Sequence, residues 1–266
     1  MRRILSAVFA LAALHGGALA ADLPARAYTK APKVDPGINW SGFYAGVNAG
    51  YGRGSSPTSL DLNVVEQGVV QPGLDNPLPP TLRPDGFIGG GQVGYNAQFG
   101  SAVAGLEADI DFSNLRKTDA ATGAPYVGGQ LTTTIDTRLD WFGTLRGRLG
   151  VLPVNNVLLY ATGGLAYGHV RTTTTGSNLP LVSCNGPGRA VYCATGTTSD
   201  VSVGWTVGGG IEYAFAPNWT IRGEYLYLDL GSRSVTFPDR DVPGGILTSS
   251  TSFTAHIGRA GLNYRF

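Results

Sequence analysis

Hydrophobic and polar residues alternate over the last eleven positions of the chain, residues 256–266. Apolar residues and glycine hold most of the even positions, which end with Tyr264 and Phe266, whereas the odd positions include Arg259, Asn263 and Arg265. Side chains of a β-strand point alternately to its two faces. The segment therefore predicts a strand with one apolar face and one polar face.

Seven earlier segments of the chain repeat this alternation. They lie at residues 43–51, 87–99, 103–112, 139–151, 157–169, 203–215 and 219–227. In the segment 139–151, for example, Leu139, Trp141 and Leu145 share the apolar face. Each segment is long enough to supply the roughly 9–11 residues of a tilted membrane strand. The pattern predicts an all-β protein, an eight-stranded antiparallel transmembrane barrel.

The connections between the predicted strands alternate between short and long. The short ones lie at residues 100–102, 152–156 and 216–218, and the long ones at 52–86, 113–138, 170–202 and 228–252. Bacterial membrane barrels have short periplasmic turns and longer extracellular loops. We therefore expect four long extracellular loops. Because the number of strands is even, both ends of the barrel should lie on the periplasmic side.

Aromatic residues on the apolar faces gather near both ends of the predicted strands. Those near the short connections are Phe43, Tyr95, Phe99, Tyr213, Phe215, Trp219, Tyr264 and Phe266. Those near the long connections are Tyr51, Phe87, Phe112, Trp141, Tyr167, Trp205 and Tyr227. Two aromatic girdles around an apolar band predict an outer surface that faces lipid. A water-soluble barrel would place its aromatic residues inside.

The start of the chain has the pattern of a secretory signal peptide, residues 1–20. Arg2 and Arg3 precede an apolar run, and Ala18-Leu19-Ala20 forms a small-x-small cleavage site. An N-terminal membrane anchor is the alternative, but the apolar run is short for a span. Residues 21–39 then predict a periplasmic tail, and residues 40–266 the barrel domain.

Composition narrows the class of protein further. The full chain has 19 Lys and Arg against 18 Asp and Glu, and Arg2 and Arg3 leave with the signal peptide. This balance offers no basic surface for nucleic acid. After the signal peptide, no run reaches the roughly 18 apolar residues of a transmembrane helix. Membrane residence therefore requires a closed barrel, in which every backbone polar group is paired.

Charged residues concentrate on the face opposite the apolar band. We expect ten of them to point into the bore: Glu107, Asp109, Asp111, Arg146, Arg148, Glu212, Arg222, Glu224, Arg259 and Arg265. Opposite signs on neighbouring strands predict ion pairs, with Arg146 paired to Glu107, Asp109 or Asp111. An eight-stranded bore is just wide enough for side chains to fill. The sequence favours a packed interior, and a narrow aqueous path is the alternative.

Two other motifs point to chemistry. Cys184 and Cys193 lie in one predicted loop of a secreted chain, which predicts a disulfide. Two thiols without a nearby histidine are too few ligands for a metal site.

Residues 89–94, Gly-Gly-Gly-Gln-Val-Gly, match a dinucleotide-binding fingerprint in spelling. That fingerprint requires a following helix, and here the strand alternation continues. No metal and no cofactor are predicted.

Two histidines are the candidates for a serine hydrolase site. His169 and His256 lie near the loop ends of their predicted strands. One family of lipid-deacylating barrels has a serine two residues after its strand histidine. This chain has Arg171 and Gly258 at those positions. We therefore predict no catalytic site.

Four stretches resemble the outer-membrane β-barrel family of alphaproteobacterial porin-like and immunogenic surface proteins. They are WSGFYAG at 40–46, WFGTLRGRLG at 141–150, LYATGGLAYG at 159–168 and GLNYRF at 261–266. The last stretch resembles the C-terminal strand of such barrels, which typically finishes on phenylalanine. The resemblance implies that Leu262, Tyr264 and Phe266 form the signal read by the outer-membrane barrel assembly machinery.

The same resemblance implies a function. It predicts a surface protein in the outer membrane of a Gram-negative bacterium, in contact with outer-membrane lipid. Its expected role is to support the envelope and to present loops for surface interactions, without catalysis. Two alternatives stay open: a narrow porin for small solutes or ions, and a surface receptor for a small ligand.

Overall fold

The computed structural model describes residues 38–66, 69–72, 81–126, 129–177, 193–238 and 245–266. All of them belong to one compact unit, Pro36–Phe266. The predicted signal peptide and Cys184 lie outside the described residues, so the cleavage site and the disulfide stay predictions. Within the described ranges, no helix is long and apolar enough to cross a membrane.

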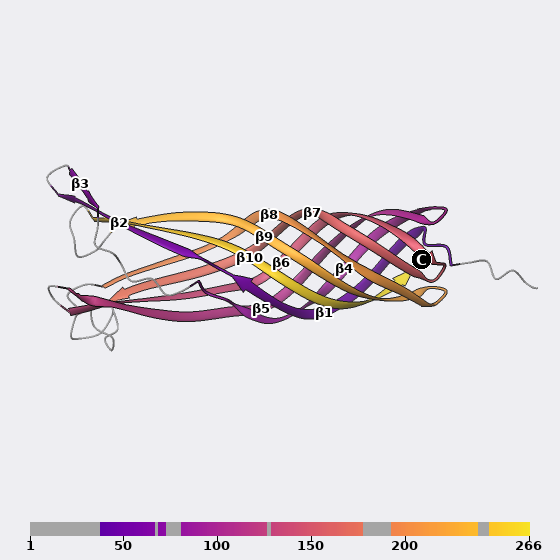
Figure 1. The fold of residues 1–266 in the computed structure, drawn as a ribbon, viewed down its shortest axis with the longest axis horizontal. Coiled ribbons are helices and arrows are strands. Elements are labelled where there is room, and N and C mark those ends of the chain that lie inside the picture. Colours follow the sequence, from indigo (N-terminus) through magenta and orange to yellow (C-terminus); the bar gives the residue numbers. More distant parts are fainter. Residues whose placement is uncertain (1–37, 67–68, 73–80, 127–128, 178–192, 239–244) are drawn as a thin grey trace, which may run out of the picture. The chain divides into compact units, whose positions relative to one another are not determined.

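Ten antiparallel strands make up one sheet (Figure 1). They are β1 (Gly42–Ser55), β2 (Thr58–Glu66), β3 (Val69–Pro72), β4 (Asp85–Phe99), β5 (Ala102–Tyr126), β6 (Gly129–Val154), β7 (Val157–Ser177), β8 (Cys193–Ala216), β9 (Trp219–Pro238) and β10 (Gly245–Arg265). Strands β1 and β4 to β10 pair in order, and β1 also pairs with β10 from Tyr44↔Arg265 to Ser55↔Thr254. These eight strands form a ring, which confirms the predicted eight-stranded antiparallel barrel.

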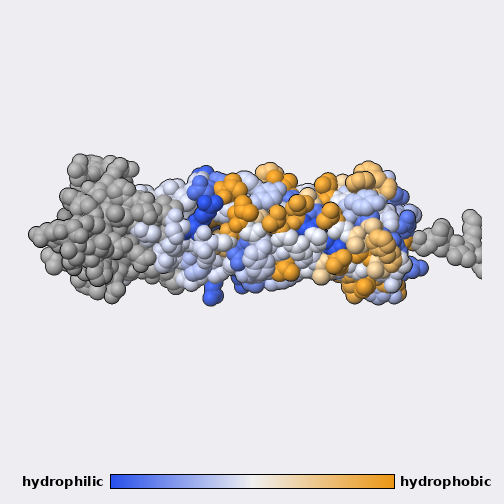
Figure 2. Space-filling model, turned by 90° about the horizontal axis from the view of Figure 1, so that it is seen from above, coloured by the Kyte–Doolittle hydropathy of each residue, from blue (hydrophilic) through white to orange (hydrophobic). Residues whose placement is uncertain are grey.

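The two faces of the strands differ as the alternation predicts. Leu106, Leu145 and Leu165 on the outer face are 65%, 52% and 58% exposed, whereas Glu107 and Arg146 on the inner face are 2% and 1% exposed. On the face in view, Figure 2 shows hydrophobic side chains along the strands. The barrel therefore has an apolar outer wall and a charged interior.

Aromatic pairs lie at both ends of this wall. At the end with the short connections, here called the turn end, Trp219 contacts Tyr264 with ring centroids 5.1 Å apart. At the opposite end, here called the loop end, Tyr51 contacts Phe87 with centroids 5.3 Å apart. Edge-to-face contacts of this kind stabilise neighbouring strands. They join residues of the two predicted girdles.

The connections at the turn end are as short as predicted. Between β4 and β5, Gly100 adopts φ +64°, a backbone conformation that favours glycine. At the loop end the structure differs from the prediction, because β5 to β10 continue through much of the segments expected to be loops. In addition, β2 and β3 lie within the first of these segments.

Threonine explains most of this extension. Residues 132–134 and 172–175 are runs of threonine, a β-branched residue that favours strands. Threonine hydroxyls also pair across strands, as between Thr122 and Thr132 at 3.1 Å and Thr173 and Thr197 at 3.3 Å. Apolar alternation marks only the part of a strand that faces lipid. The prediction therefore ended the strands where their outer faces become polar.

A bulge corrects one predicted orientation. Leu139 was expected on the outer face, but its side chain is 1% exposed and lies inside the barrel. The register between β6 and β7 shifts between Leu139 and Trp141, so Asp140 is an extra residue. An extra residue inverts the alternation on one side of the bulge. Hence both Leu139 and Phe142 point inward, whereas Trp141 stays in the outer girdle.

The ring divides into two groups of strands at the loop end. Pairing between β8 and β9 begins only at Trp205↔Asp229, and pairing between β4 and β5 begins only at Asp85↔Arg116. Beyond these points β5 to β8 pair with one another, and β9, β10, β2 and β3 pair with one another. Figure 1 shows the two groups separating toward the end that carries β2 and β3.

Candidate functional site

Arg146 lies at the centre of the charged interior. Its guanidinium donates to Glu107 at 2.5 Å, to Asp109 at 2.7 Å and to Glu224 at 3.1 Å. Its Nε donates to Thr144 at 2.8 Å. Because Glu107 faces Arg146 in the β5–β6 register, adjacent strands bring this pair together. Glu224, on β9, reaches Arg146 across the bore.

Arg259 links the same acids from β10. Its Nε and Nη2 contact Glu224 at 2.7 and 2.6 Å, its Nη1 donates to Asp111 at 2.8 Å, and its Nη2 donates to Asp109 at 2.8 Å. Asp109 thus accepts from both Arg146 and Arg259. Charge-assisted bonds to several partners compensate the cost of removing these charges from water.

The remaining pairs extend the network toward the turn end. Arg222 pairs with Glu107, and Arg148 pairs with Glu212. Glu212 also accepts from Thr220 at 2.5 Å and from Asn263 at 2.9 Å. Nine of the ten charged residues that the sequence placed in the bore thus lie in ion pairs there.

Arg265, the tenth residue, lies at the turn end apart from these ion pairs. It donates to the carbonyl oxygens of Asn39 at 3.0 Å and Pro217 at 2.6 Å. Its guanidinium also lies 5.0 Å from the centre of a Trp40 ring, within the range of a cation–π contact. Arg265 therefore fastens the segment before β1 to the end of the barrel.

Two tyrosines that sequence reasoning missed complete the network. Tyr44 donates to Glu107 at 2.6 Å, and Tyr160 donates to Glu224 at 3.0 Å. The Arg148 guanidinium lies 3.7 Å from the centre of the Tyr160 ring. A Cβ on Gly94 would lie 2.4 Å from the Tyr44 ring, so glycine makes room for this tyrosine. The sequence did carry one sign of these contacts, since the alternation places positions 44 and 160 on the inward face of their strands.

Apolar clusters fill the bore on both sides of the charged network. The loop-end cluster comprises Ile88, Leu115, Leu139, Phe142, Ala166, Val170, Leu226, Leu228, Leu230, Phe253, Ala255 and Ile257. The turn-end cluster comprises Ile38, Trp40, Val103, Leu152, Leu158, Tyr160 and Ala214. Trp40 is 1% exposed and donates its indole N–H to the Asn155 carbonyl at 3.0 Å. Along the barrel, the network thus lies between two apolar layers.

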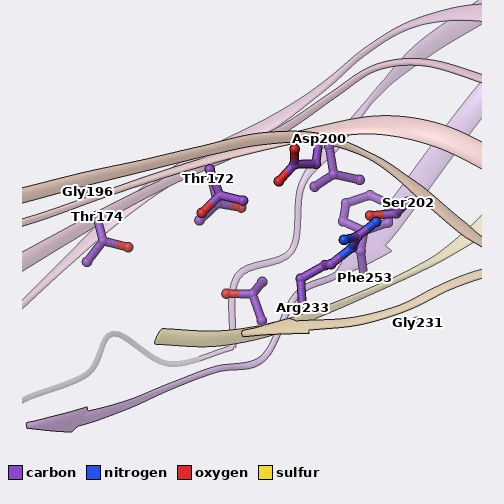
Figure 3. A pocket seen from close by; sticks show the side chains of 11 residues that line it. Thr172, Thr174, Gly196, Asp200, Ser202, Gly231, Arg233 and Phe253 are labelled. Atoms are coloured by element: carbon purple, nitrogen blue, oxygen red, sulfur yellow. The ribbon is translucent and has the colours of Figure 1, made fainter. Parts of the chain in front are cut away.

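A polar cleft lies where the two groups of strands separate (Figure 3). It is lined by Val170, Thr172, Thr174, Gly196, Thr198, Asp200, Ser202, Gly231, Arg233, Thr251 and Phe253. Its free volume is about 40 Å³, room for roughly three water molecules. The cleft offers hydroxyl groups, one carboxylate and one guanidinium around an aromatic ring.

A serine, a histidine and an aspartate form a hydrogen-bonded chain on the outer face. His169 lies 2.9 Å from Asp140 through Nδ1 and 3.1 Å from Ser199 through Nε2. This is the order of contacts in a serine hydrolase triad. The sequence prediction missed it because the serine comes from a neighbouring strand, and because the bulge at Asp140 was not foreseen.

The surroundings of Ser199 differ from those of a nucleophile in an active site. Thr198 and Asp200 line the cleft inside the barrel, so Ser199 points to the opposite, convex face. Active sites are concave and exclude water, whereas Ser199 is exposed. Elsewhere in the described ranges, no three His, Cys, Asp or Glu side chains are grouped to hold a metal ion.

Comparison with known proteins gives the family of this chain. The model of the outer membrane protein beta-barrel domain matches residues 6–266. The 31 kDa outer-membrane immunogenic protein of Brucella melitensis is 36% identical over 98% of this chain and 97% of its own length. The 22 kDa outer membrane protein of Rhizobium leguminosarum is 28% identical over 88% of this chain and 81% of its own length.

Among solved structures, the outer membrane protein OprG of Pseudomonas aeruginosa is 12% identical, with a TM-score of 0.49, over 86% of this chain and 98% of that chain. The family model and the Brucella relative both extend over nearly the whole chain. The chain belongs to the outer-membrane β-barrel family and is a surface protein of the outer membrane of a Gram-negative bacterium.

Proposed function

We propose that this protein is a structural barrel, closed to solutes, that supports the envelope and presents its loop end for surface interactions. The observation that carries the proposal is the filled bore. Five carboxylates and four guanidiniums form a network of ion pairs at its centre. Apolar clusters lie on both sides of this network. A selectivity filter would more often present a ring of one sign facing water.

The outer wall supports the biogenesis that the sequence implies. Leu262, Tyr264 and Phe266 lie on the lipid face of the final strand, with 38%, 38% and 76% exposure. An exposed aromatic terminus is available to the barrel assembly machinery, which we propose as a partner before membrane insertion. Once the barrel is inserted, the same side chains face lipid.

Single-channel recording in planar bilayers tests the closed bore. We expect refolded wild-type protein to give no steady openings, because charged and apolar side chains occupy the bore. The double variant Arg146→Ala/Glu107→Ala removes two central side chains and should conduct more than the wild type. The matched control Arg116→Ala/Asp136→Ala, on the outer face, should stay silent. Steady openings of the wild type would instead favour the narrow porin.

The cleft in Figure 3 favours a receptor as the second candidate. Its hydroxyl groups, Asp200 and Arg233 are the kinds of groups that orient a small polar ligand. Its free volume of about 40 Å³ is far below the 300–1,000 Å³ typical of ligand sites. A ligand would therefore have to part the strands, which ranks this role below the structural one.

A further inference from the structure

Three arginines stand side by side across the outer face of the barrel. Arg116 on β5 pairs directly with Arg138 on β6, and Arg138 pairs directly with Arg171 on β7. Their neighbours Leu115 and Leu139 are buried in the bore. Alternation therefore directs the three guanidiniums outward. We call these residues the arginine row.

In the part of the chain that the structure describes, no acidic side chain neutralises this row. Within the described residues, none of the three arginines lies within ion-pair distance of a carboxylate. The Nε atoms of Arg138 and Arg171 are buried without a hydrogen-bond partner in that part of the chain. Like charges directly opposite each other destabilise a sheet. The positive charge and the free donors of the row therefore call for an anion from outside the described protein.

The carboxylates nearest in register contact other groups. Asp85, opposite Arg116, accepts from Tyr51. Asp136 accepts from Thr118 at 2.5 Å, and Asp140 contacts His169 at 2.9 Å. These contacts hold the three acids away from the row.

The position of the row indicates which anion it meets. Arg116 lies four residues beyond Phe112, Arg138 three residues from Trp141, and Arg171 four residues beyond Tyr167, all toward the loop end. At about 3.3 Å per residue on tilted strands, the row lies roughly 8–10 Å beyond the girdle. Aromatic girdles mark the level of the lipid headgroups. The long side chains can reach that level from the extracellular side.

We propose that the arginine row binds phosphate groups of an anionic lipid in the outer leaflet. Guanidinium forks bind phosphate through two parallel hydrogen bonds. Directly paired Cα atoms lie about 5 Å apart, so neighbouring arginines can hold one phosphate between them. Lipid phosphate relieves the repulsion within the row and satisfies its free donors. This site is independent of the proposed function, because a closed bore does not require it.

Titration of lipid into detergent-refolded full-length protein, followed by native mass spectrometry, tests the site. The probes are bis-phosphorylated lipid A, the same lipid with both phosphates removed, and inorganic phosphate. We expect the wild type to retain the phosphorylated lipid and to release the dephosphorylated one. Equal retention of the two lipids would overturn the proposal. If millimolar inorganic phosphate competed as effectively as the lipid, the assignment of the site to a lipid would be overturned.

Variants locate the site. The triple variant R116Q/R138Q/R171Q should bind the phosphorylated lipid about a hundredfold more weakly, since each basic residue near a lipid surface contributes roughly a factor of five. The control R53Q/R83Q/K117Q removes the same charge from exposed positions outside the row and should bind like the wild type. Equal losses in both variants would show only general attraction and would overturn the site. If the triple variant does not refold, R138Q alone should lose about fivefold.

Discussion

At the scale of single residues, the interior depends on charges that share partners. Arg146 pairs with Glu107, Asp109 and Glu224 at once, and Arg259 lies within ion-pair distance of the same three acids. Removing one guanidinium leaves several buried carboxylates without full compensation. Such a loss costs more than the net contribution of the intact pair, because the remaining charges stay desolvated.

Arg146→Met should therefore lower the free energy of unfolding by about 3–5 kcal/mol. Urea titration of protein refolded in vesicles measures this value. The matched control Arg116→Met removes a guanidinium from the outer face and should cost less than about 1 kcal/mol. The double variant Arg146→Met/Glu107→Gln should lose less than the sum of its single variants. Additive losses would mean that water solvates the charges separately.

Ser199 gives a second test at this scale. Its hydroxyl completes a triad-like chain with His169 and Asp140, but it lies on a convex face open to solvent. We expect hydrolysis of a short-chain nitrophenyl ester or of phospholipid to be the same for wild type and Ser199→Ala. A wild-type rate at least tenfold above that of the variant would identify a hydrolase and contradict a non-catalytic role.

At the scale of elements, the sequence predicted the lipid-facing part of every barrel strand. Alternation was informative there because one face is apolar and the other is charged or small. It lost contrast where both faces are apolar, as on β9, where Tyr225 and Tyr227 face outward while Leu226 and Leu228 fill the bore. The alternation also gave no sign of the bulge at Asp140. One extra residue changes the face to which the neighbouring side chains point, and no particular residue type marks its position. The apolar layers of the bore were therefore not foreseen.

The wall of β6 provides a test of depth. Leu145 lies between the two girdles and is 52% exposed to the lipid side. Leu145→Arg should reduce the free energy of unfolding by about 2–4 kcal/mol, whereas Tyr51→Arg in the loop-end girdle should cost about 0–1 kcal/mol. Urea unfolding in vesicles compares the two variants. Equal costs would contradict a membrane-spanning orientation of the wall.

Deletion of Asp140 tests the bulge itself. Without the extra residue, Leu139 and Trp141 become neighbours in sequence and still face opposite sides, because strand parity is strict. We therefore expect the deletion to lower the free energy of unfolding by less than about 1 kcal/mol. The control deletion of Gly147, in the regular part of β6, inverts one side of the strand and should cost about 2–5 kcal/mol or more by displacing buried side chains. Urea unfolding of both variants measures the difference, and equally large losses in both would rule out a bulge at Asp140.

At the scale of the whole molecule, the barrel has two chemically different ends. The turn end is closed by Trp40 and short turns, and the loop end carries paired strands beyond the girdle. The family places this barrel in the outer membrane, so the loop end faces the outside of the cell.

Cysteine labelling of intact cells checks this orientation. In a C184S/C193S background, Ser234→Cys near the loop end should react with a membrane-impermeant maleimide. Asn155→Cys in the β6–β7 turn should react only after the cells are permeabilised. Both positions are exposed in the structure, so burial does not explain a difference. Labelling of Asn155→Cys from outside would invert the topology.

The pairing of β1 with β10 affects the order of events in which the barrel folds and closes. Tyr44 must meet Arg265, which lies near the opposite end of the described part of the chain. Contacts so distant in sequence form late, because the chain between them must be ordered first. The edges of β1 and β10 stay open until that moment, and open edges invite pairing with other chains. Before the barrel closes, the chain therefore needs protection of these two edges until β1 has paired with β10.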